Sequence, residues 1–352
     1  MDLQRSLLIG AIAVLSFMLL TEWVAFKDER APMPEQSSRL INGAETAETD
    51  LPEPAAPNKP SEEDLPDIPT EDTSAAPADS SVASAMPSGQ LIQVHTDVLQ
   101  FVVDLRGGDI IELALPKFLA KIDNPDVPFV LLEQNNARTY IAQSGLIGAN
   151  GIDSNGRALF ESASNRYELE EGKDSLTIDL IWTGNDAVKV TKRLTLRRGD
   201  YLVDVTYLVE NNSGERWQGN LFGQIKRDSS APPASDSPGM GMQPFLGVAI
   251  TQPDERFTKF SFEDMAEEPF KAKLPGGWIA MIQHYFLTAW IPAQEQSHTF
   301  SARVTRSGYN IAGFTSPALT LDPGQSGQVK AEFYAGPKDQ YRLEEISPYL
   351  DL

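Results

Sequence analysis

Cysteine is absent from this sequence of 352 residues, and histidine occurs only three times. Without cysteine there is no disulfide framework, no thiol nucleophile and no thiolate metal site. The histidines, His95, His284 and His298, form neither an HExxH nor an HxH pair, so a three-ligand metal site is not expected. His284 stands beside Tyr285 in an apolar run, which favours a hydrogen-bonded structural histidine over a catalyst. The GxSxG, GxxxxGK[ST] and GxGxxG patterns are missing too, so no motif indicates catalysis or a cofactor.

Positive charge is scarce: 29 Lys and Arg residues stand against 50 Asp and Glu residues, a net charge of −21. A nucleic-acid-binding surface needs a basic stripe, and a face that adheres to anionic lipid needs clustered Lys and Arg. The charge balance therefore argues against both, and no nucleic-acid partner is expected.

An apolar run that can be extended to the length of a membrane span occurs only near the start, where residues 7–20 read LLIGAIAVLSFMLL without a charge. Extended through Phe26, the stretch reaches about 20 residues, or roughly 30 Å as a helix, the thickness of the hydrocarbon core of a bilayer. A cleaved signal peptide is the competing interpretation, but no small-x-small cleavage site follows the apolar core. We predict an uncleaved transmembrane signal anchor over residues 1–26. Its contacts with the lipid bilayer would come from Leu7, Leu8, Ile9, Ile12, Val14, Leu15, Phe17, Met18, Leu19, Leu20 and the interfacial Trp23.

Since no second apolar run of that length follows, residues 27–352 are expected on one side of the membrane, which we predict to be the periplasmic side. Residues 27–90 contain no Phe, Trp or Tyr, but 10 of the 25 prolines, 14 acidic and 4 basic side chains. So little apolar surface cannot offset the loss of backbone entropy on folding. This stretch is predicted to be a disordered, Pro-rich acidic linker.

Short β-rich segments separated by turns fill residues 91–352. Residues 176–180, LTIDL, alternate apolar and polar side chains at the period of a half-buried antiparallel strand. We predict strands at 91–95, 98–105, 110–115, 129–132, 139–143, 175–183, 188–197, 201–210, 217–226, 297–305, 309–314 and 327–334. The predicted fold is mainly β, one antiparallel two-sheet sandwich over residues 91–352.

Two further features complete this domain. Residues 276–292, GGWIAMIQHYFLTAWIP, form a mostly apolar run that indicates two buried strands or a bent one. Residues 338–346 have helical spacing between Pro337 and Pro348, with Tyr341, Leu343 and Ile346 as candidate helix residues. Trp182, Trp217, Trp278 and Trp290 could stack on a sugar, but core packing is the simpler interpretation.

Several stretches, taken in order, resemble the YidC/Oxa/Alb family of membrane protein insertases. They are the apolar N-terminus, GQLIQVHTDVLQFVVDLRGGDI at 89–110, AQSGLIG at 142–148, LRRGDY at 196–201, the run at 276–292, FYAGPKDQ at 333–340 and SPYLDL at 347–352. The long run is the most specific of these, and its motif residues are Gly276, Gly277, Trp278, Tyr285, Phe286, Trp290 and Pro292.

The resemblance implies a two-sheet supersandwich, similar to galactose-mutarotase-like domains, with a short C-terminal helix packed on it. It implies insertion of nascent membrane proteins into the bacterial inner membrane without nucleotide hydrolysis or a cofactor, alone or beside the SecYEG translocon, and contact of the periplasmic domain with SecDF. In the family a five-helix bundle follows this domain. The chain is therefore expected to be an anchor plus a periplasmic domain, and not an enzyme.

Two alternatives remain open at this point. A carbohydrate-binding or mutarotase-like domain would need a His/Glu site in a groove, because fold alone does not carry function. A periplasmic chaperone or scaffold would need a large exposed apolar patch on one sheet.

Overall fold

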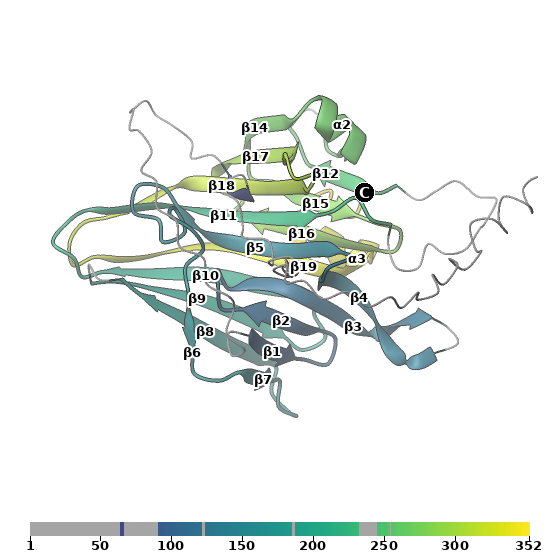
Figure 1. Ribbon diagram of the computed structural model, residues 1–352, viewed down its shortest axis with the longest axis horizontal. Coiled ribbons are helices and arrows are strands. Elements are labelled where there is room, and N and C mark those ends of the chain that lie inside the picture. The colour runs from purple at the N-terminus through teal and green to yellow at the C-terminus, as the bar shows by residue number, and fades with distance from the viewer. Residues whose placement is uncertain (1–63, 67–90, 122–123, 185–186, 232–244, 254) are drawn as a thin grey trace, which may run out of the picture. The chain divides into compact units, whose positions relative to one another are not determined.

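The computed structural model describes residues 64–66, 91–121, 124–184, 187–231, 245–253 and 255–352, which belong to one compact unit (Figure 1). The predicted anchor and nearly all of the predicted linker lie outside these residues. Within them, no helix has the length and apolar character needed to cross a bilayer. The boundaries predicted at residues 26 and 90 remain predictions.

Two large β-sheets make up the domain. The first has ten strands in the order β14–β17–β18–β11–β5–β4–β3–β2–β1–β7, and neighbours run antiparallel except β1 and β7. Its strands are β1 (Leu91–His95), β2 (Gln100–Asp104), β3 (Asp109–Lys121), β4 (Asn124–Gln134), β5 (Thr139–Ile147), β7 (Arg166–Glu168), β11 (Trp217–Arg227), β14 (Phe270–Pro275), β17 (Ser297–Val304) and β18 (Asn310–Leu321).

The second sheet has nine strands in the order β13–β12–β15–β16–β19–β10–β9–β8–β6, all antiparallel. They are β6 (Glu161–Ser162), β8 (Ser175–Thr183), β9 (Val188–Arg197), β10 (Leu202–Asn211), β12 (Gly247–Ile250), β13 (Thr258–Ser261), β15 (Ile279–Ile282), β16 (Phe286–Pro292) and β19 (Ser326–Pro337). Two short helices are described, α2 (Phe262–Glu267) and α3 (Gln340–Ile346). The predicted mainly-β, two-sheet architecture with a C-terminal helix is confirmed.

The strands with clear alternation were predicted best, and β8 and β9 have the predicted bounds. The short strands β6, β7, β13 and β14 and the helix α2 were not predicted. A signal for α2 was present in the sequence: the Ser261 hydroxyl accepts a hydrogen bond from the Asp264 amide, and the Asp264 carboxylate accepts one from the Ser261 amide. That arrangement is a capping box, which the order Ser-Phe-Glu-Asp allows.

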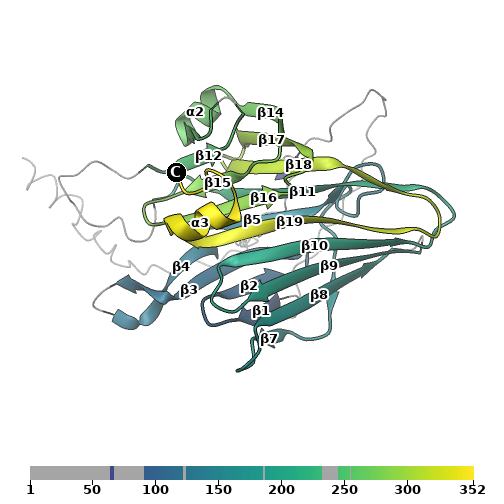
Figure 2. The same cartoon turned by 180° about the vertical axis from the view of Figure 1, so that it is seen from behind.

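The main core fills the space between the sheets. Val205 and Val209 of β10 belong to this core together with Phe300 and Phe314 of the other sheet, and Trp290 of β16 packs against Phe314. A second, smaller core lies on the other side of β15 and β16, beneath α3 (Figure 2). It contains Leu202, Ala249, Trp278, Ala280, Ile282, Leu287, Ala289, Ile291, Tyr334, Leu343 and Leu350.

Three residues of the predicted linker, Asp64, Leu65 and Pro66, are described, and Asp64 is only 3% exposed. Polar contacts join this segment to the ten-stranded sheet. The predicted disorder of residues 27–90 stays a prediction.

Candidate functional site at the C-terminal helix

Two glycines begin the site with a tight turn before β15. Gly276 and Gly277 have φ angles of +57° and +86°, a region that residues with a side chain rarely adopt. The side chain of Gln294 closes the turn: its Nε2 donates to the Gly277 carbonyl, and its Oε1 accepts from the Gly277 amide, both at 3.0 Å. A Cβ atom on Gly277 would lie 2.6 Å from Cγ2 of Thr251. The sequence Gly-Gly is therefore a geometric requirement for placing Trp278.

Strands β15 and β16 are buried on both faces, which explains the long apolar run. Phe286 and Trp290 point into the main core, whereas Leu287 and Ile291 point into the second core. A strand covered on both faces reads as a continuous apolar run, without alternation. The prediction of two buried strands is confirmed, and α3 is part of what covers the second face (Figure 2).

The helix α3 is fixed by one cap, one ion pair and one apolar side chain. The Asp339 carboxylate accepts hydrogen bonds from the amides of Tyr341 and Arg342, as expected of an N-cap. Arg342 donates through Nε and a terminal nitrogen to the two carboxylate oxygens of Asp200, at 3.2 and 2.6 Å. Burial alone would lower the pKa of Arg342, but the hydrogen bonds and charge of Asp200 raise it. Leu343, 2% exposed, inserts into the second core.

The residues after α3 return to the same core. The indole Nε1 of Trp278 donates to the Pro348 carbonyl at 3.0 Å, and Leu350 is 3% exposed. Arg256 lies over the ring of Tyr349, 4.9 Å from its centroid. The C-terminal segment is thereby fastened to β15 as well as to α3.

A pocket of about 310 Å³ opens beside this segment. Its walls are mostly apolar and include Phe257 and Leu343, and two cations line it, Lys259 and Lys338. Burial lowers the pKa of Lys338, and the charge of Lys259 lowers it further. Lys259 lies 5.0 Å from the ring centroid of Phe257. The pocket therefore combines apolar surface with two positively charged side chains and one acidic side chain, Asp351.

The structure brings together some predicted motif residues and separates others. Trp278 and Leu343 meet in the second core, Ile346 packs partly against it, and Gly276 and Gly277 form the turn that precedes Trp278. Phe286 and Trp290 serve the main core, and Pro292 ends β16 opposite Ala331. Tyr285 and Tyr341 are exposed by 64% and 81%. The predicted anchor residues lie outside the described part of the chain.

His284 corrects one prediction. It was expected to be a hydrogen-bonded structural histidine, but it is exposed in the turn between β15 and β16, where its ring stacks on Tyr285 at 3.8 Å. The apolar run misled the prediction because the turn interrupts it. His298 is the buried, hydrogen-bonded histidine: its ring nitrogens contact the Ser316 hydroxyl and the Ala293 carbonyl. Burial lowers the pKa of His298.

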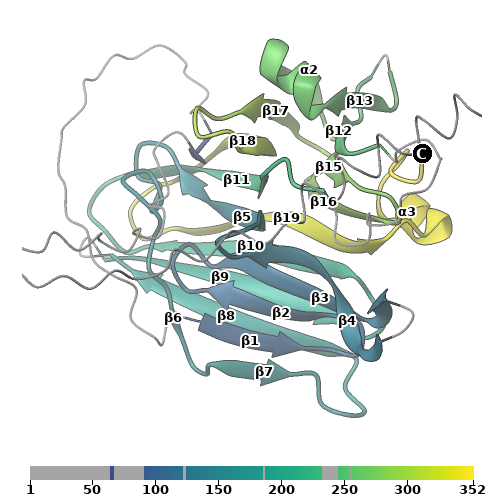
Figure 3. The ribbon, with the colours of Figure 1, turned by 45° about the vertical axis from the view of Figure 1, so that its right-hand side comes forward.

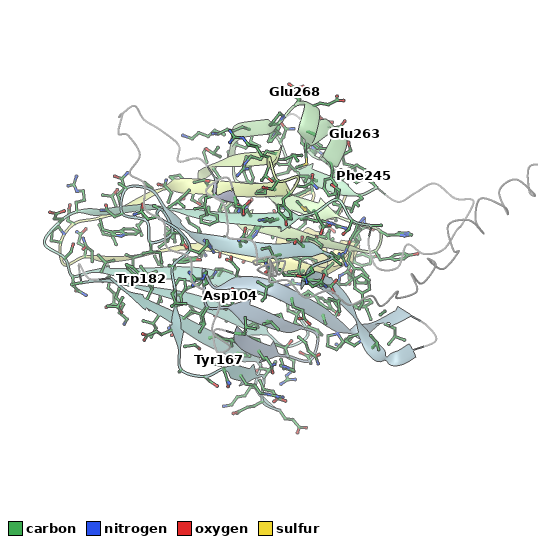
Figure 4. The ribbon with its side chains drawn as sticks, viewed as in Figure 1. Asp104, Tyr167, Trp182, Phe245, Glu263 and Glu268 are labelled. Atoms are coloured by element: carbon green, nitrogen blue, oxygen red, sulfur yellow. The ribbon has the colours of Figure 1, made fainter. Side chains whose placement is uncertain are left out.

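Other candidate sites do not form in the described residues. Trp217, Trp278 and Trp290 are buried in the cores. Trp182 lies far from Phe245, which flanks the second core where Trp278 lies, so Trp182 and Trp278 do not form one stacking platform (Figure 4). No group of three metal-ligating side chains occurs in the part of the chain that the structure describes. Exposed large apolar side chains, among them Leu91, Ile181 and Tyr341, are spread over both sheets and the C-terminal segment. This distribution does not match the single sheet-face patch that a scaffold would need.

A cluster of buried charges around the turn between β2 and β3 is sealed from solvent. Arg157 pairs with Asp109 and Asp153, and its side chain is 3% exposed. Lys192 donates to the carbonyls of Gly107 and Gly108, at 3.1 and 2.7 Å. Burial, partly offset by Asp109, lowers the pKa of Lys192 to about 7. These groups hold the β2–β3 turn and have no access to a substrate.

Sequence reasoning missed the partners that hold the site, namely Asp200, Gln294, Asp339 and Lys259. Asp339 carried a readable signal, since an acidic residue just before a helical pattern is a typical N-cap. The other three act across long sequence distances, for which a single sequence holds no signal.

The described residues thus define a two-sheet β domain whose C-terminal helix is fixed on the outer face of one sheet. Residues 91–352 match the family model of the YidC periplasmic domain. The whole chain is 44% identical to the membrane protein insertase YidC of Cellvibrio japonicus, of which it covers 61%. It is 40% identical to that of Pseudomonas aeruginosa (strain LESB58), of which it covers 63%.

The chain therefore belongs to the YidC family, and residues 91–352 are its periplasmic domain, as the sequence predicted. This membership places the protein in the bacterial inner membrane with that domain in the periplasm. The chain spans a little over three fifths of the length of these relatives.

Solved structures give a weaker likeness. A galactose mutarotase related enzyme from Lactobacillus acidophilus aligns with a TM-score of 0.44 at 12% identity, covering 70% of this chain and 97% of that one. A galactose mutarotase-like protein from Lactobacillus casei aligns with a TM-score of 0.46 at 10% identity, covering 70% and 99%. Similarity at this level carries no argument about activity.

Proposed function

We propose that this chain is the N-terminal part of a membrane protein insertase that inserts and folds inner-membrane proteins, alone or with the SecYEG translocon. In this proposal residues 1–26 anchor the chain in the bilayer and residues 27–90 are a tether. The β domain is the periplasmic module that contacts accessory Sec subunits such as SecDF. Nascent membrane proteins are handled by the part of the protein that this chain does not include. The family membership and the build of the C-terminal site support this division of labour.

The observation that carries the proposal is the contrast between the two sides of α3. Its inner side is fixed by Leu343 and by the Arg342–Asp200 pair. Its outer side presents Tyr341, 81% exposed, with the exposed Glu344 and Glu345. An exposed aromatic side chain on a rigid support is a typical centre of a protein–protein contact.

Photocrosslinking in the full-length protein tests the assignment. A photoreactive amino acid at position 341 is expected to crosslink to accessory Sec subunits in inner membranes. The same residue at position 181, where Ile181 of β8 is 38% exposed, is the matched control and is expected to give no such product. Strong crosslinks from either position to nascent membrane proteins would contradict the division of labour.

Complementation of an insertase-depleted strain gives a second readout. Leu343→Asp buries a charge under α3 and is expected to reduce both membrane insertion and the crosslinks from position 341. Glu344→Gln, on the exposed side, is the control for expression and folding. Hydrogen exchange in the same variant shows whether α3 is detached. If Leu343→Asp detaches α3 and still complements fully, α3 is not needed for insertion.

A further inference from the structure

Three residues from the predicted linker lie on the ten-stranded sheet. Asp64, Leu65 and Pro66 appear as a short purple segment beside β18 in Figure 1 and again in Figure 3. Their contacts reach β11 and β17, and the Lys226–Asp64 pair joins positions 162 residues apart. This placement is unrelated to α3 and does not rest on the proposed function.

The segment occupies the face of the sheet that points away from the main core. Ile225 of β11 and Ala302 of β17 belong to the core. Their neighbours in sequence, Gln224, Lys226 and Arg303, point to the opposite face because side chains alternate along a strand. The site therefore lies across β17, β18, β11 and β5 on the outer surface of the sheet.

Two contacts of the site are made with the peptide backbone of the segment. Gln224 Nε2 donates to the Asp64 carbonyl at 2.6 Å, and a terminal nitrogen of Arg303 donates to the Leu65 carbonyl at 3.1 Å. Asp64 lies in a 3₁₀ turn and Leu65 in a bend, and Pro66 disfavours a helical conformation at Leu65. Contacts of this kind recognise the peptide backbone more than one particular side chain.

A chain of buried hydrogen bonds orients the first of these donors. Gln224 Nε2 also donates to Gln143 Oε1 at 3.0 Å, and Gln143 Nε2 donates to Asp109 Oδ2 at 2.8 Å. Asp109 in turn pairs with the buried Arg157. Gln143 and Gln224 are 6% and 2% exposed with the segment in place, and the hydrogen bond from Gln224 to Gln143 fixes the orientation of the amide that meets the segment.

The third contact recognises an acidic side chain. Lys226 Nζ lies 2.6 Å from Asp64 Oδ2, and the two side chains are 12% and 4% exposed. The ring of Tyr309 supports the ammonium group at 4.2 Å. Among the described residues, Oδ1 of Asp64 is buried without a hydrogen-bond partner, so the described contacts leave one polar atom of the occupant unsatisfied. A buried acceptor without a partner costs free energy, which weakens the binding of this occupant to the site.

We propose that this outer-face site, formed by Gln143, Gln224, Lys226, Arg303 and Tyr309, is a recognition site for acidic peptide segments of the type Asp-apolar-Pro. Residues 64–66 are its ligand in cis. An acidic segment of a partner protein binds there by displacing them. Gln224 and Arg303 contact the backbone of the segment, and Lys226 supplies the selectivity for a carboxylate.

Competition in the full chain tests the proposal. The probe is a fluorescein-labelled peptide with the sequence of residues 61–69, SEEDLPDIP, and the control peptide is its scramble PSDEPILED, which has no acidic-apolar-Pro segment. We expect Asp64→Asn to raise the affinity of the chain for the probe at least tenfold over the unsubstituted chain, because the cis ligand is weakened. Adding Lys226→Met to Asp64→Asn is expected to reverse the gain, and the scramble is expected to bind at least tenfold more weakly.

Asp322→Asn is the matched control, since Asp322 forms an exposed ion pair with Arg216. Its affinity for the probe is expected to equal that of the unsubstituted chain. Hydrogen exchange of residues 64–65 in the same variants reports the cis contact separately, and Asp64→Asn and Lys226→Met are each expected to accelerate it. Accelerated exchange without probe binding at millimolar concentration would show an intramolecular clip only and would overturn the proposal. Unchanged exchange would overturn the cis contact itself.

Discussion

The indole nitrogen of Trp278 donates a hydrogen bond of 3.0 Å to the backbone carbonyl of Pro348, 70 positions further along the chain. This bond joins the turn that starts β15 to the segment that follows α3. Leu343 and Leu350 strengthen this attachment, because they pack in the same small core as Trp278. The C-terminal helix is thus a fixed part of the β domain.

Removing that donor should loosen the C-terminal segment. Trp278→Phe leaves the Pro348 carbonyl without its partner and is expected to lower the free energy of unfolding by about 1–3 kcal/mol. Chemical denaturation followed by circular dichroism measures this, and exchange of amides in residues 340–350 should accelerate. Trp182→Phe, at a partly buried position on β8, is expected to change stability by less than about 0.5 kcal/mol. Equal losses for the two variants would contradict a special role of this hydrogen bond.

The turn before Trp278 should tolerate no side chain. Gly277→Ala places a Cβ in a left-handed conformation at a cost of about 1–2 kcal/mol, and its contact with Thr251 adds to that loss. Gly308→Ala is the matched control, because Gly308 has a similar φ of +82° but open space around it. We expect Gly277→Ala to be less stable than Gly308→Ala by about 1–3 kcal/mol in thermal or chemical unfolding. The same stability in both would mean that the Thr251 contact relaxes without cost.

The ion pair between Arg342 and Asp200 should stabilise the attachment of α3 more than it stabilises the domain as a whole. Arg342 and Asp200 side chains are 33% and 11% exposed, so solvent screens part of their attraction. Arg342→Ala is expected to cost about 0.5–1 kcal/mol and to accelerate exchange in residues 340–346, with a smaller difference at high salt. Arg216→Ala removes a more exposed pair with Asp322 and should cost less. Unchanged exchange in α3 would show that Leu343 alone holds the helix.

The buried Lys192 predicts a pH dependence of stability. Its pKa is lowered to about 7 by burial in the folded domain, whereas the ordinary value is 10.5. Between these values the unfolded chain binds more protons, so the free energy of unfolding rises with pH across this window. The unsubstituted chain should gain about 2 kcal/mol between pH 7 and pH 9 relative to Lys192→Met.

Denaturation of both chains at several pH values measures this difference. Lys189→Met is the control, because the side chain of Lys189 is 41% exposed in its pair with Glu210, and it should run parallel to the unsubstituted chain. Parallel curves for Lys192→Met as well would show that Lys192 keeps its proton in the folded domain.

The sequence predicted the elements whose signals are local. Strands β8 and β9 alternate along their length, and α3 lies between Pro337 and Pro348 with Asp339 at its start. The apolar run of residues 276–292 predicted buried strands, because outside a membrane a run of apolar side chains is stable only when both faces of the strand are covered. The identity of the family also came from such stretches.

Long-range contacts decided the rest. No sequence pattern indicates that Trp278 meets Pro348, that Arg342 meets Asp200, or that His284 falls in a turn. The order of Asp64–Pro66 depends on Gln224, Lys226 and Arg303, which only the packed sheet brings together. By itself the sequence determined a β domain, its C-terminal helix and its family, because periodicity and motifs are carried by neighbouring residues. The tertiary structure alone determined which polar groups meet, because hydrogen bonds between distant strands depend on register and on the stacking of the two sheets.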